Sequence, residues 1–218
     1  MLILQARTNC ANVFWHGSIR DVFSMLLTLD DVAYTTKPDR MEFARIMNRM
    51  KTAKPREVDK RELLAHIAAG KTFIGGTFEN ELQTLTSWQL AALDFDNDTT
   101  VLDANGKPLK DENGNTVKRF LQPGEDGYIT PLEALERCES LRIAPMVMYQ
   151  SFNCSIENPR FRIVFDMGEG ITEVDTAEAV MLNLHDAFPE CDHKCTNLNR
   201  MYCGTDKAVW AICEAWFI

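Results

Sequence analysis

The fold is decided by the stretch Trp88-Gln-Leu-Ala-Ala-Leu-Asp94-Phe-Asp96. Its apolar run has the composition and length of a buried β-strand, and it ends in two acids separated by one residue. Successive side chains of a strand point to opposite faces. We therefore expect Asp94 and Asp96 to share one face, with Leu93 and Phe95 turned into the core.

The acid pair at the end of this strand suits a divalent cation. Two carboxylates side by side on one face repel each other unless a cation lies between them, and their hard oxygen atoms favour Mg²⁺ or Mn²⁺. Two such ions can activate an attacking hydroxyl and stabilise a leaving group. Asp-x-Asp also occurs in glycosyltransferases, in phosphatases and at plain strand ends, so the pair alone names no reaction.

A second strand, predicted at about 160–166, carries two arginines. Arg160 and Arg162 share one of its faces, and Phe161, Ile163 and Phe165 share the other. Two guanidinium groups beside the Ser/Asn-rich turn at 151–155 can bind a triphosphate. The other interpretation is an exposed strand face whose arginines pair with nearby acids.

The elements around these two strands predict an α+β fold, a sheet with helices packed on it. Helices are expected at 39–51, from a cap at Asp59 to Gly70, from Thr130 onward, and at 173–188. Further strands are expected at 143–151, 200–203 and 207–213. We divide the chain into a mostly helical N-terminal lobe, 1–75, and a core, 76–218. Two Asn-Gly turns predict an inserted hairpin at about 97–127.

The charge is distributed unevenly along the 218 residues, whose net charge is −9. Residues 163–193 contain eight acids and no Lys or Arg, whereas residues 37–61 hold nine of the 23 basic side chains. A basic segment in an acidic chain predicts one surface for a phosphate backbone. A solvated helix surface is the other interpretation. The residues expected to bind nucleic acid are Arg45, Arg49, Lys51, Lys54 and Arg56.

The seven cysteines lack a secretion signal before them, so reduced thiols are expected rather than disulfides. No apolar run is long enough for a membrane span, and the expected location is the cytoplasm. Zinc is a further alternative at four residues late in the chain, although they lack paired C-x-x-C knuckles. These four are Cys191, His193, Cys195 and Cys203.

Three segments together resemble the archaeo-eukaryotic primase superfamily. They are GGTFENELQTLTSWQLAALDFDN, YQSFNCSIENPRFRIVF and DHKCTNLNRMYCGTDK, and they occur in the family's order and approximate spacing. The likeness covers about residues 60–210. It is strongest to the primase-polymerase domains of phages and of Gram-positive plasmids or integrated elements. The resemblance implies an RRM-like catalytic sheet combined with an N-terminal α/β lobe.

The resemblance also implies roles for individual residues. The family's Asp-x-Asp falls on Asp94 and Asp96, which would be catalytic and hold two Mg²⁺ or Mn²⁺ ions. Its third acid falls on Asp192, with Asp166 as the competing choice. The expected nucleotide-binding residues are Ser151, Asn153, Cys154, Arg160, Arg162, Arg200 and Lys207. Many relatives have a histidine where this chain has Cys154, which puts the strength of catalysis in doubt.

The function implied is template-directed nucleotidyl transfer by a two-metal mechanism in the replication of a mobile element. The partners would be a single-stranded DNA template and nucleoside triphosphates. A helicase, in the same chain or separate, is expected because this sequence has no P-loop. The alternatives are a non-catalytic nucleic-acid or origin-binding module with the same fold, and a two-metal nuclease.

Overall fold

The computed structural model of the chain describes residues 13–14 and 24–212. The described part is an α+β structure with a six-stranded sheet (order β1-β12-β9-β10-β6-β5), a four-stranded sheet (order β11-β4-β2-β3) and a two-stranded ribbon, β7-β8. The helices are α1 (Arg40–Thr52), α2 (Lys60–Ala68), α3 (Pro131–Leu141) and α4 (Val174–Ala187). The strands are β1 (Val13–Phe14), β2 (Met25–Ala33), β3 (Arg56–Val58), β4 (Lys71–Ile74), β5 (Gly76–Glu79), β6 (Thr84–Phe95), β7 (Asp98–Thr100), β8 (Lys118–Phe120), β9 (Pro145–Gln150), β10 (Phe161–Ile171), β11 (Met201–Cys203) and β12 (Val209–Ala211).

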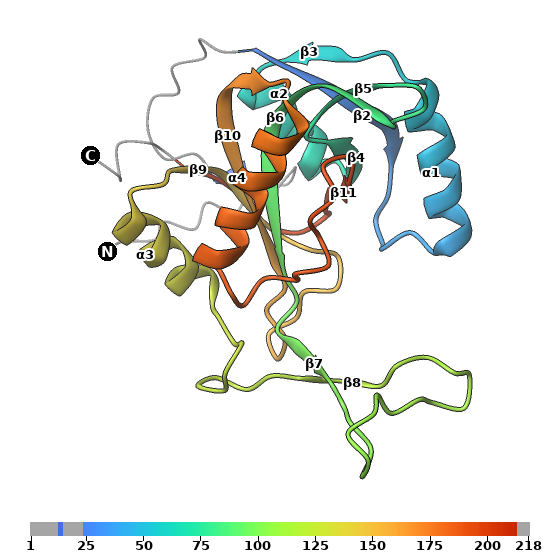
Figure 1. Cartoon of the computed structure of the whole chain (residues 1–218), viewed down its shortest axis with the longest axis vertical. Helices are drawn as coiled ribbons and strands as arrows, with labels where there is room; N and C mark the ends of the chain where they lie inside the picture. Colours follow the sequence, from blue (N-terminus) through green and yellow to red (C-terminus); the bar gives the residue numbers. More distant parts are fainter. Residues whose placement is uncertain (1–12, 15–23, 213–218) are drawn as a thin grey trace.

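The six-stranded sheet is covered on both faces, so its strand β6, which lies between β10 and β5, is buried on both sides. Leu93 and Phe95 pack with α3 and α4 on one face. Leu90 and Ala92 pack on the other face with α2 and strands of the smaller sheet. Figure 1 shows α3 and α4 on one side of β6, β9 and β10, and the smaller sheet with α1 on the opposite side. Because side chains alternate along β6, Asp94 lies on the face that meets the smaller sheet.

The pairing of β6 with β10 sets the position of the charged residues. The two strands are antiparallel, with Arg162 opposite Asp94 and Phe161 opposite Phe95. The two phenylalanine rings are stacked, with their centroids 4.6 Å apart. The predicted faces of both strands are therefore confirmed: the apolar residues are buried against the helices, and the charged residues share the opposite face.

Local signals open α2 and α3 where they were expected. Capping boxes open α2 at Asp59 with Glu62 and open α3 at Thr130 with Glu133. After α2 the chain turns at Gly70, whose φ is 72° and where a Cβ would lie 1.9 Å from the carbonyl oxygen of Tyr34. That position requires glycine. Over the described ranges, no helix combines the length and the apolar character needed to cross a membrane.

The N-terminal lobe differs from its prediction as mostly helical. It contains strands β2, β3 and β4, and β11 from residues 201–203 completes its sheet. Both helices of the lobe are amphipathic and need an apolar surface to pack on. The sheet provides it: Ile46 and Met50 of α1 pack against Ile74 and Leu82. Because β11 returns to this sheet from the C-terminal part, no single boundary at residue 75 separates the two lobes.

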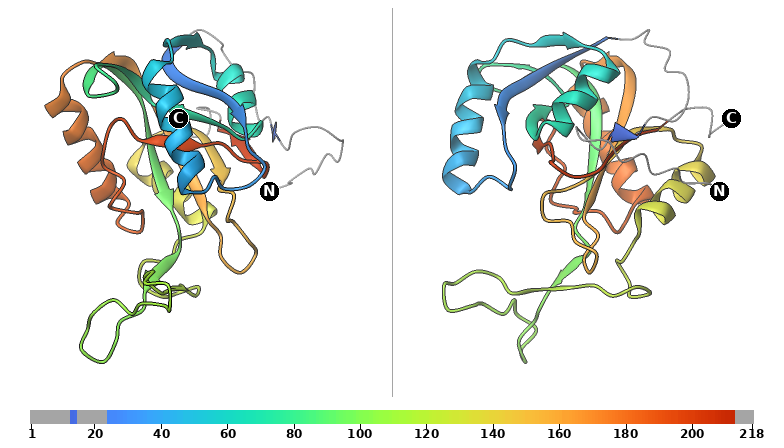
Figure 2. Two further views of the ribbon diagram at one scale, coloured as in Figure 1. Left: turned by 90° about the vertical axis from the view of Figure 1, so that its right-hand side faces the viewer. Right: turned by 180° about the vertical axis from the view of Figure 1, so that it is seen from behind.

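The predicted insertion is an extended arm. Strands β7 and β8 pair at its base, and two isolated bridges, Leu102 with Pro108 and Lys110 with Thr116, continue it outward. Asp103 accepts hydrogen bonds from the backbone of Asn105 and Lys107 at the first turn, and Asp111 does the same at the second. Both views in Figure 2 show the arm projecting from the end of the domain at which β6 stops.

Candidate functional site

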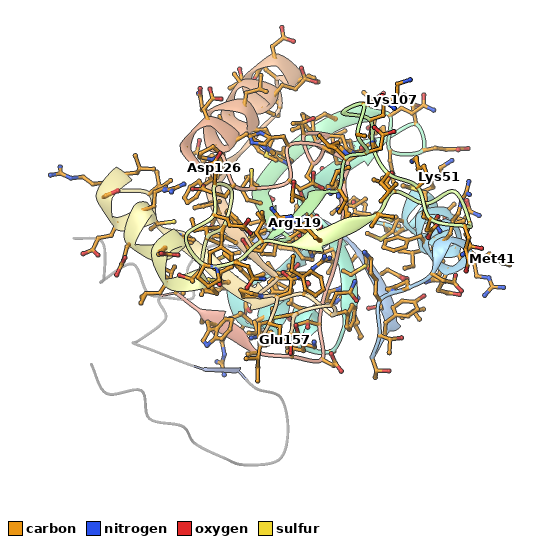
Figure 3. All side chains as sticks on the ribbon, turned by 90° about the horizontal axis from the view of Figure 1, so that it is seen from below. Met41, Lys51, Lys107, Arg119, Asp126 and Glu157 are labelled. Carbon is orange, nitrogen blue, oxygen red and sulfur yellow. The ribbon has the colours of Figure 1, made fainter. Side chains whose placement is uncertain are left out.

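A cavity of about 420 Å³ lies where the two sheets meet, at the carboxyl end of β6. Four basic and three acidic side chains line it, together with amides, a hydroxyl and apolar groups. The underside of the molecule, seen in Figure 3, presents Arg119 of the arm and Glu157 of the loop that follows β9. The lining residues are Lys37, Phe43, Met47, Asp94, Asp96, Ser151, Phe152, Asn153, Arg160, Arg162, Asp192, Asn197, Asn199, Arg200, Met201, Cys203 and Gly204.

The three acids expected to be catalytic all line this cavity. Asp94 and Asp96 come from the end of β6, and Asp192 comes from the loop that follows α4. The backbone N–H of Asp192 donates to the carbonyl oxygen of Asp94 at 2.8 Å, so the two residues are direct neighbours. Asp166, the competing third acid, is exposed on β10 opposite Leu90 and does not line the cavity. Geometry therefore groups Asp192 with the acid pair.

Asp94 is the counter-ion of a buried arginine. Arg162 Nε donates to Asp94 Oδ1 at 2.5 Å, and the side chains of the two residues keep only 11% and 14% of their surface exposed. A second nitrogen of Arg162, NH1, donates to the hydroxyl of Tyr149 and to the carbonyl oxygen of Cys203. Its guanidinium also lies over the rings of Tyr149 and Tyr202. Arg162 is thus fixed from several sides, and Asp94 contributes to packing as well as to the cavity.

Asp96 is held more loosely. Its Oδ1 lies 3.4 Å from Arg160 NH1, while the other nitrogen of Arg160 donates to Asp98 Oδ2 at 2.5 Å. Burial raises the pKa of Asp96; Arg160 opposes this, and the negative charges of Asp94 and Asp98 add to it. A second cation beside Asp96 would relieve this repulsion, which is the electrostatic condition for a metal-binding carboxylate.

A thiol links the other two acids. Cys195 Sγ donates to Asp192 Oδ2 at 3.1 Å and lies 4.0 Å from Asp94 Oδ2. Burial raises the pKa of Cys195, so the thiol keeps its proton and can donate. Burial also works to raise the pKa of Asp192, but the hydrogen bonds from Cys195 and Lys194 and the charge of Arg200 outweigh it and lower that pKa. The carboxylates of Asp94 and Asp192 therefore converge on one point.

Most of the residues expected to bind nucleotide line the cavity, but two lie outside it. Ser151, Asn153, Arg160, Arg162 and Arg200 are on its wall. Lys207 instead donates to the backbone carbonyl oxygen of Cys154, and neither residue lines the cavity. Lys207 therefore holds the loop that follows β9.

Sequence reasoning missed part of the wall. Lys37, Phe43 and Met47 come from the start of the basic segment and from α1, and Asn197 and Asn199 come from the loop before β11. Only the return of β11 to the N-terminal sheet brings these segments to the acids. Of these residues only Lys37 stood out in the sequence, as a member of the basic segment 37–61. No sequence pattern connected it with Asp94.

The basic segment makes intramolecular ion pairs. Arg45 bonds Glu42, Arg49 bonds Asp30, Lys51 bonds Glu81 and Arg56 bonds Asp31, with closest distances of 2.8, 2.7, 3.0 and 2.9 Å. Lys54 is exposed. Four of the five residues expected to bind nucleic acid therefore have an acidic partner within the chain. The pairs of Arg45, Lys51 and Arg56 are exposed, and such pairs are weak and can exchange partners, whereas Arg49 bonds the buried Asp30.

The structure also changes the predicted zinc set. Among the residues that it describes, His185, Cys191 and His193 form a group that could bind a metal, with one ligand atom from each lying within 4.8 Å of the others. Cys195 points instead to the acids, and Cys203 Sγ accepts from Thr72 Oγ1. His185 was missed. Its signal was a histidine on the apolar face of α4, one turn after Met181.

The cavity can therefore hold divalent cations on its carboxylates and anions on its arginines, side by side. Its size falls at the lower end of small-molecule binding sites, about 300–1,000 Å³. The chain matches no family model, no curated protein and no solved structure.

Proposed function

We propose that this chain is a metal-dependent nucleotidyltransferase, the catalytic domain of a DNA primase-polymerase of a mobile element. One observation carries the proposal. The end of β6, the segment 151–162 and the segment 192–204 are far apart in the sequence, and all three line one cavity with three acids and four basic side chains. These are the three segments that resemble the primase superfamily.

The acids have the donor set that the reaction requires. Asp94, Asp96 and Asp192 would hold two Mg²⁺ or Mn²⁺ ions, whose chemistry when bound is to activate a 3′-hydroxyl and to stabilise the leaving pyrophosphate. Asp192 is already joined to Asp94 by the backbone hydrogen bond and by the thiol of Cys195. The protein therefore contributes oxygen ligands from two separate segments at one place.

Two of the basic residues, Arg160 and Arg200, can exchange their carboxylate partners for phosphate groups. Arg160 contacts Asp96, and Arg200 lies 3.9 Å from Asp94. Once cations occupy the carboxylates, these guanidinium groups can turn to the phosphates of an incoming nucleotide. Arg162 has a different role, because its three bonded partners and two aromatic rings hold it in place as a positioning residue for Asp94.

Ser151 and Asn153 supply the neutral polar groups on the wall beside Arg160. A single-stranded template would approach from the side of α1 and the arm, where Lys37 lines the cavity and Lys54 is exposed. A helicase acting with this domain completes the proposal, because priming requires an opened duplex.

A primer-extension assay with labelled deoxynucleotides, a primed single-stranded template and Mg²⁺ or Mn²⁺ tests the proposal. We expect extension by the wild type and none by Asp96→Asn or Asp192→Asn. Asp166→Asn is the matched control, because Asp166 is also an acid of the same core but is exposed on β10, outside the cavity. Equal extension by wild type and Asp96→Asn would overturn the metal assignment.

A second candidate is non-catalytic binding of nucleotide or nucleic acid. It is favoured by the ion pairs, since arginines already neutralise Asp94 and Asp96 and can be the reason why these acids are present. The same assay separates it, because such a module would retain the template without extending or cutting it. Cleavage of the labelled template would identify the nuclease alternative instead.

A further inference from the structure

A second group of possible metal ligands lies on either side of Asp192 in the sequence and at the end of α4. His185 belongs to the last turn of α4, and Cys191 and His193 belong to the loop that follows. One ligand atom from each lies within 4.8 Å of the other two. The carboxylate cavity does not include these residues, although Cys191 and His193 line a neighbouring cavity of about 310 Å³.

His185 is buried with an unsatisfied ring nitrogen. The residue is only 3% exposed, and its Nε2 has no hydrogen-bond partner. The other nitrogen, Nδ1, lies 3.1 Å from Cys191 Sγ. A buried polar atom without a partner is rare in native proteins and calls for a missing one.

His193 is already oriented as a metal ligand. Its Nε2 lies 2.8 Å from the carbonyl oxygen of Pro189, which can only accept, so Nε2 must carry the proton. The lone pair of Nδ1 is then free. A histidine that binds a metal commonly donates its other ring N–H to a backbone carbonyl in this way.

We infer that His185, Cys191 and His193 bind a borderline-soft divalent cation, with Zn²⁺ as the expected ion. Imidazole nitrogen and thiolate sulfur select such ions over Mg²⁺, whose ligands are oxygen atoms. The three protein ligands leave a further position for a solvent molecule. Binding displaces the proton of the Cys191 thiol, which passes to solvent as the thiolate becomes a ligand.

The ion would also fix the position of Asp192. Cys191 and His193 face the proposed ion, while Asp192, between them, lines the carboxylate cavity and donates its N–H to Asp94. An ion that clamps both neighbours therefore restrains the backbone that presents Asp192. The metal site is inferred from the geometry of its own three ligands. That fixing Asp192 matters for catalysis rests on the function proposed above.

Titration of the full chain with Co²⁺ tests the site, since a bound thiolate gives a sulfur-to-cobalt charge-transfer absorption. We expect one equivalent to produce this band in the wild type, and Zn²⁺ to abolish it by displacement. Cys191→Ser should lose the band. His193→Ala should weaken binding at least about tenfold without unfolding the chain, because His193 is exposed.

Two thiol variants keep the assignment falsifiable. Cys154→Ser controls for a thiol elsewhere and should leave the band unchanged. Cys195→Ser should also leave it unchanged, although Cys195 Sγ lies beside Asp94 and Asp192. Loss of the band in Cys195→Ser but not in Cys191→Ser would place the ion among the carboxylates and overturn the proposal, as would the absence of any band in the folded wild type.

Amide hydrogen exchange separates this proposal from the proposed function. Without Mg²⁺ or Mn²⁺, Zn²⁺ should slow exchange across residues 190–195, including the Asp192 amide, at least about tenfold in the wild type and not in Cys191→Ser. Slowed exchange without primer extension would sustain the metal site and refute the polymerase. Extension by a chain that binds neither Co²⁺ nor Zn²⁺ would do the reverse.

Discussion

Two pairs of arginines, one at the start of β10 and one on α1, are alike in the sequence and differ in their surroundings. Arg160 and Arg162 alternate along a strand, and their side chains are 14% and 11% exposed. Arg45 and Arg49 lie one turn apart on a helix and are 63% and 37% exposed. Each of the four contacts an acid. The difference lies in how deeply those acids are buried.

At β10 the closest carboxylate partner of each arginine is nearly inaccessible, since the side chains of Asp98 and Asp94 are 5% and 14% exposed. On α1 only Asp30 is buried to that degree, at 3%, whereas Glu42 is 23% exposed. An arginine paired with a buried acid is held in a fixed position, whereas an arginine paired with an exposed acid remains part of a solvated surface. The number of basic residues in a segment therefore says little about which of them can take up a ligand.

The largest effect is expected from Asp94→Asn. It leaves the buried guanidinium of Arg162 without its counter-ion, which should lower the free energy of unfolding by about 3–5 kcal/mol. Urea denaturation measures this. Asp96→Asn is the control and should lose less than about 1 kcal/mol, because its side chain is 38% exposed and its contact with Arg160 is 3.4 Å long. If the two variants lost the same free energy of unfolding, Asp94 would not differ from Asp96 in its contribution to stability.

The next effect concerns catalysis rather than folding. If the cavity performs nucleotidyl transfer, Asp96→Asn should lower the rate of single-turnover extension at least about 100-fold, equivalent to about 2.7 kcal/mol in the barrier. The melting temperature, measured on the same preparation, should stay close to that of the wild type. A rate within about threefold of the wild type would remove Asp96 from the ligand set.

A smaller contrast is expected within α1. Arg49→Ala deprives the buried Asp30 of its two hydrogen bonds from the guanidinium, at 2.8 and 2.7 Å, and should cost about 2 kcal/mol of stability. Arg45→Ala removes an exposed ion pair with Glu42, which lies one turn earlier on the same helix, and should lower the stability by less than about 0.5 kcal/mol. Urea denaturation of both variants checks this. If the two losses were alike, burial of the acid would not be the deciding quantity.

The smallest effect is expected in DNA affinity. Arg45→Ala and Lys54→Ala leave the buried ion pairs intact, so each can report on phosphate contacts without unfolding the lobe. For single-stranded DNA, each lost contact should flatten the dependence of log affinity on log salt by about 0.7. Fluorescence anisotropy across a series of salt concentrations measures the slope. Unchanged slopes would mean that Arg45 and Lys54 lie on a solvated surface that does not contact DNA.

The features that sequence reasoning found are those encoded by neighbouring residues. The alternation around Asp94 placed both acids on one face of β6, and the capping pattern located the start of α2 at Asp59 and that of α3 at Thr130. The arm was legible from its two Asn-Gly turns. In each case a few adjacent side chains carry the whole signal.

The features that it missed depend on residues distant in the chain. The Met/Leu run that forms β2 has no clear period, and its pairing with β3 and β4 becomes visible only once the lobe is assembled. The partners of Arg49 and Arg162 lie 19 and 68 residues away. His185 looked like part of an ordinary apolar helix face, because its neighbours in space come from the next loop. Spacing along the chain does not predict such contacts.

The return of β11 to the N-terminal sheet has a consequence for the order of folding. Pairing of Tyr202 with Phe73 closes a very long loop, and contacts of this kind form late because their entropic cost must be met before they stabilise anything. A nascent chain that has not yet released residues 197–204 from the ribosome can form β6 with Asp94 and Asp96 but lacks the facing wall of the cavity. The site is therefore completed only after residues 197–204 have been released, when β11 joins the sheet that earlier residues have built.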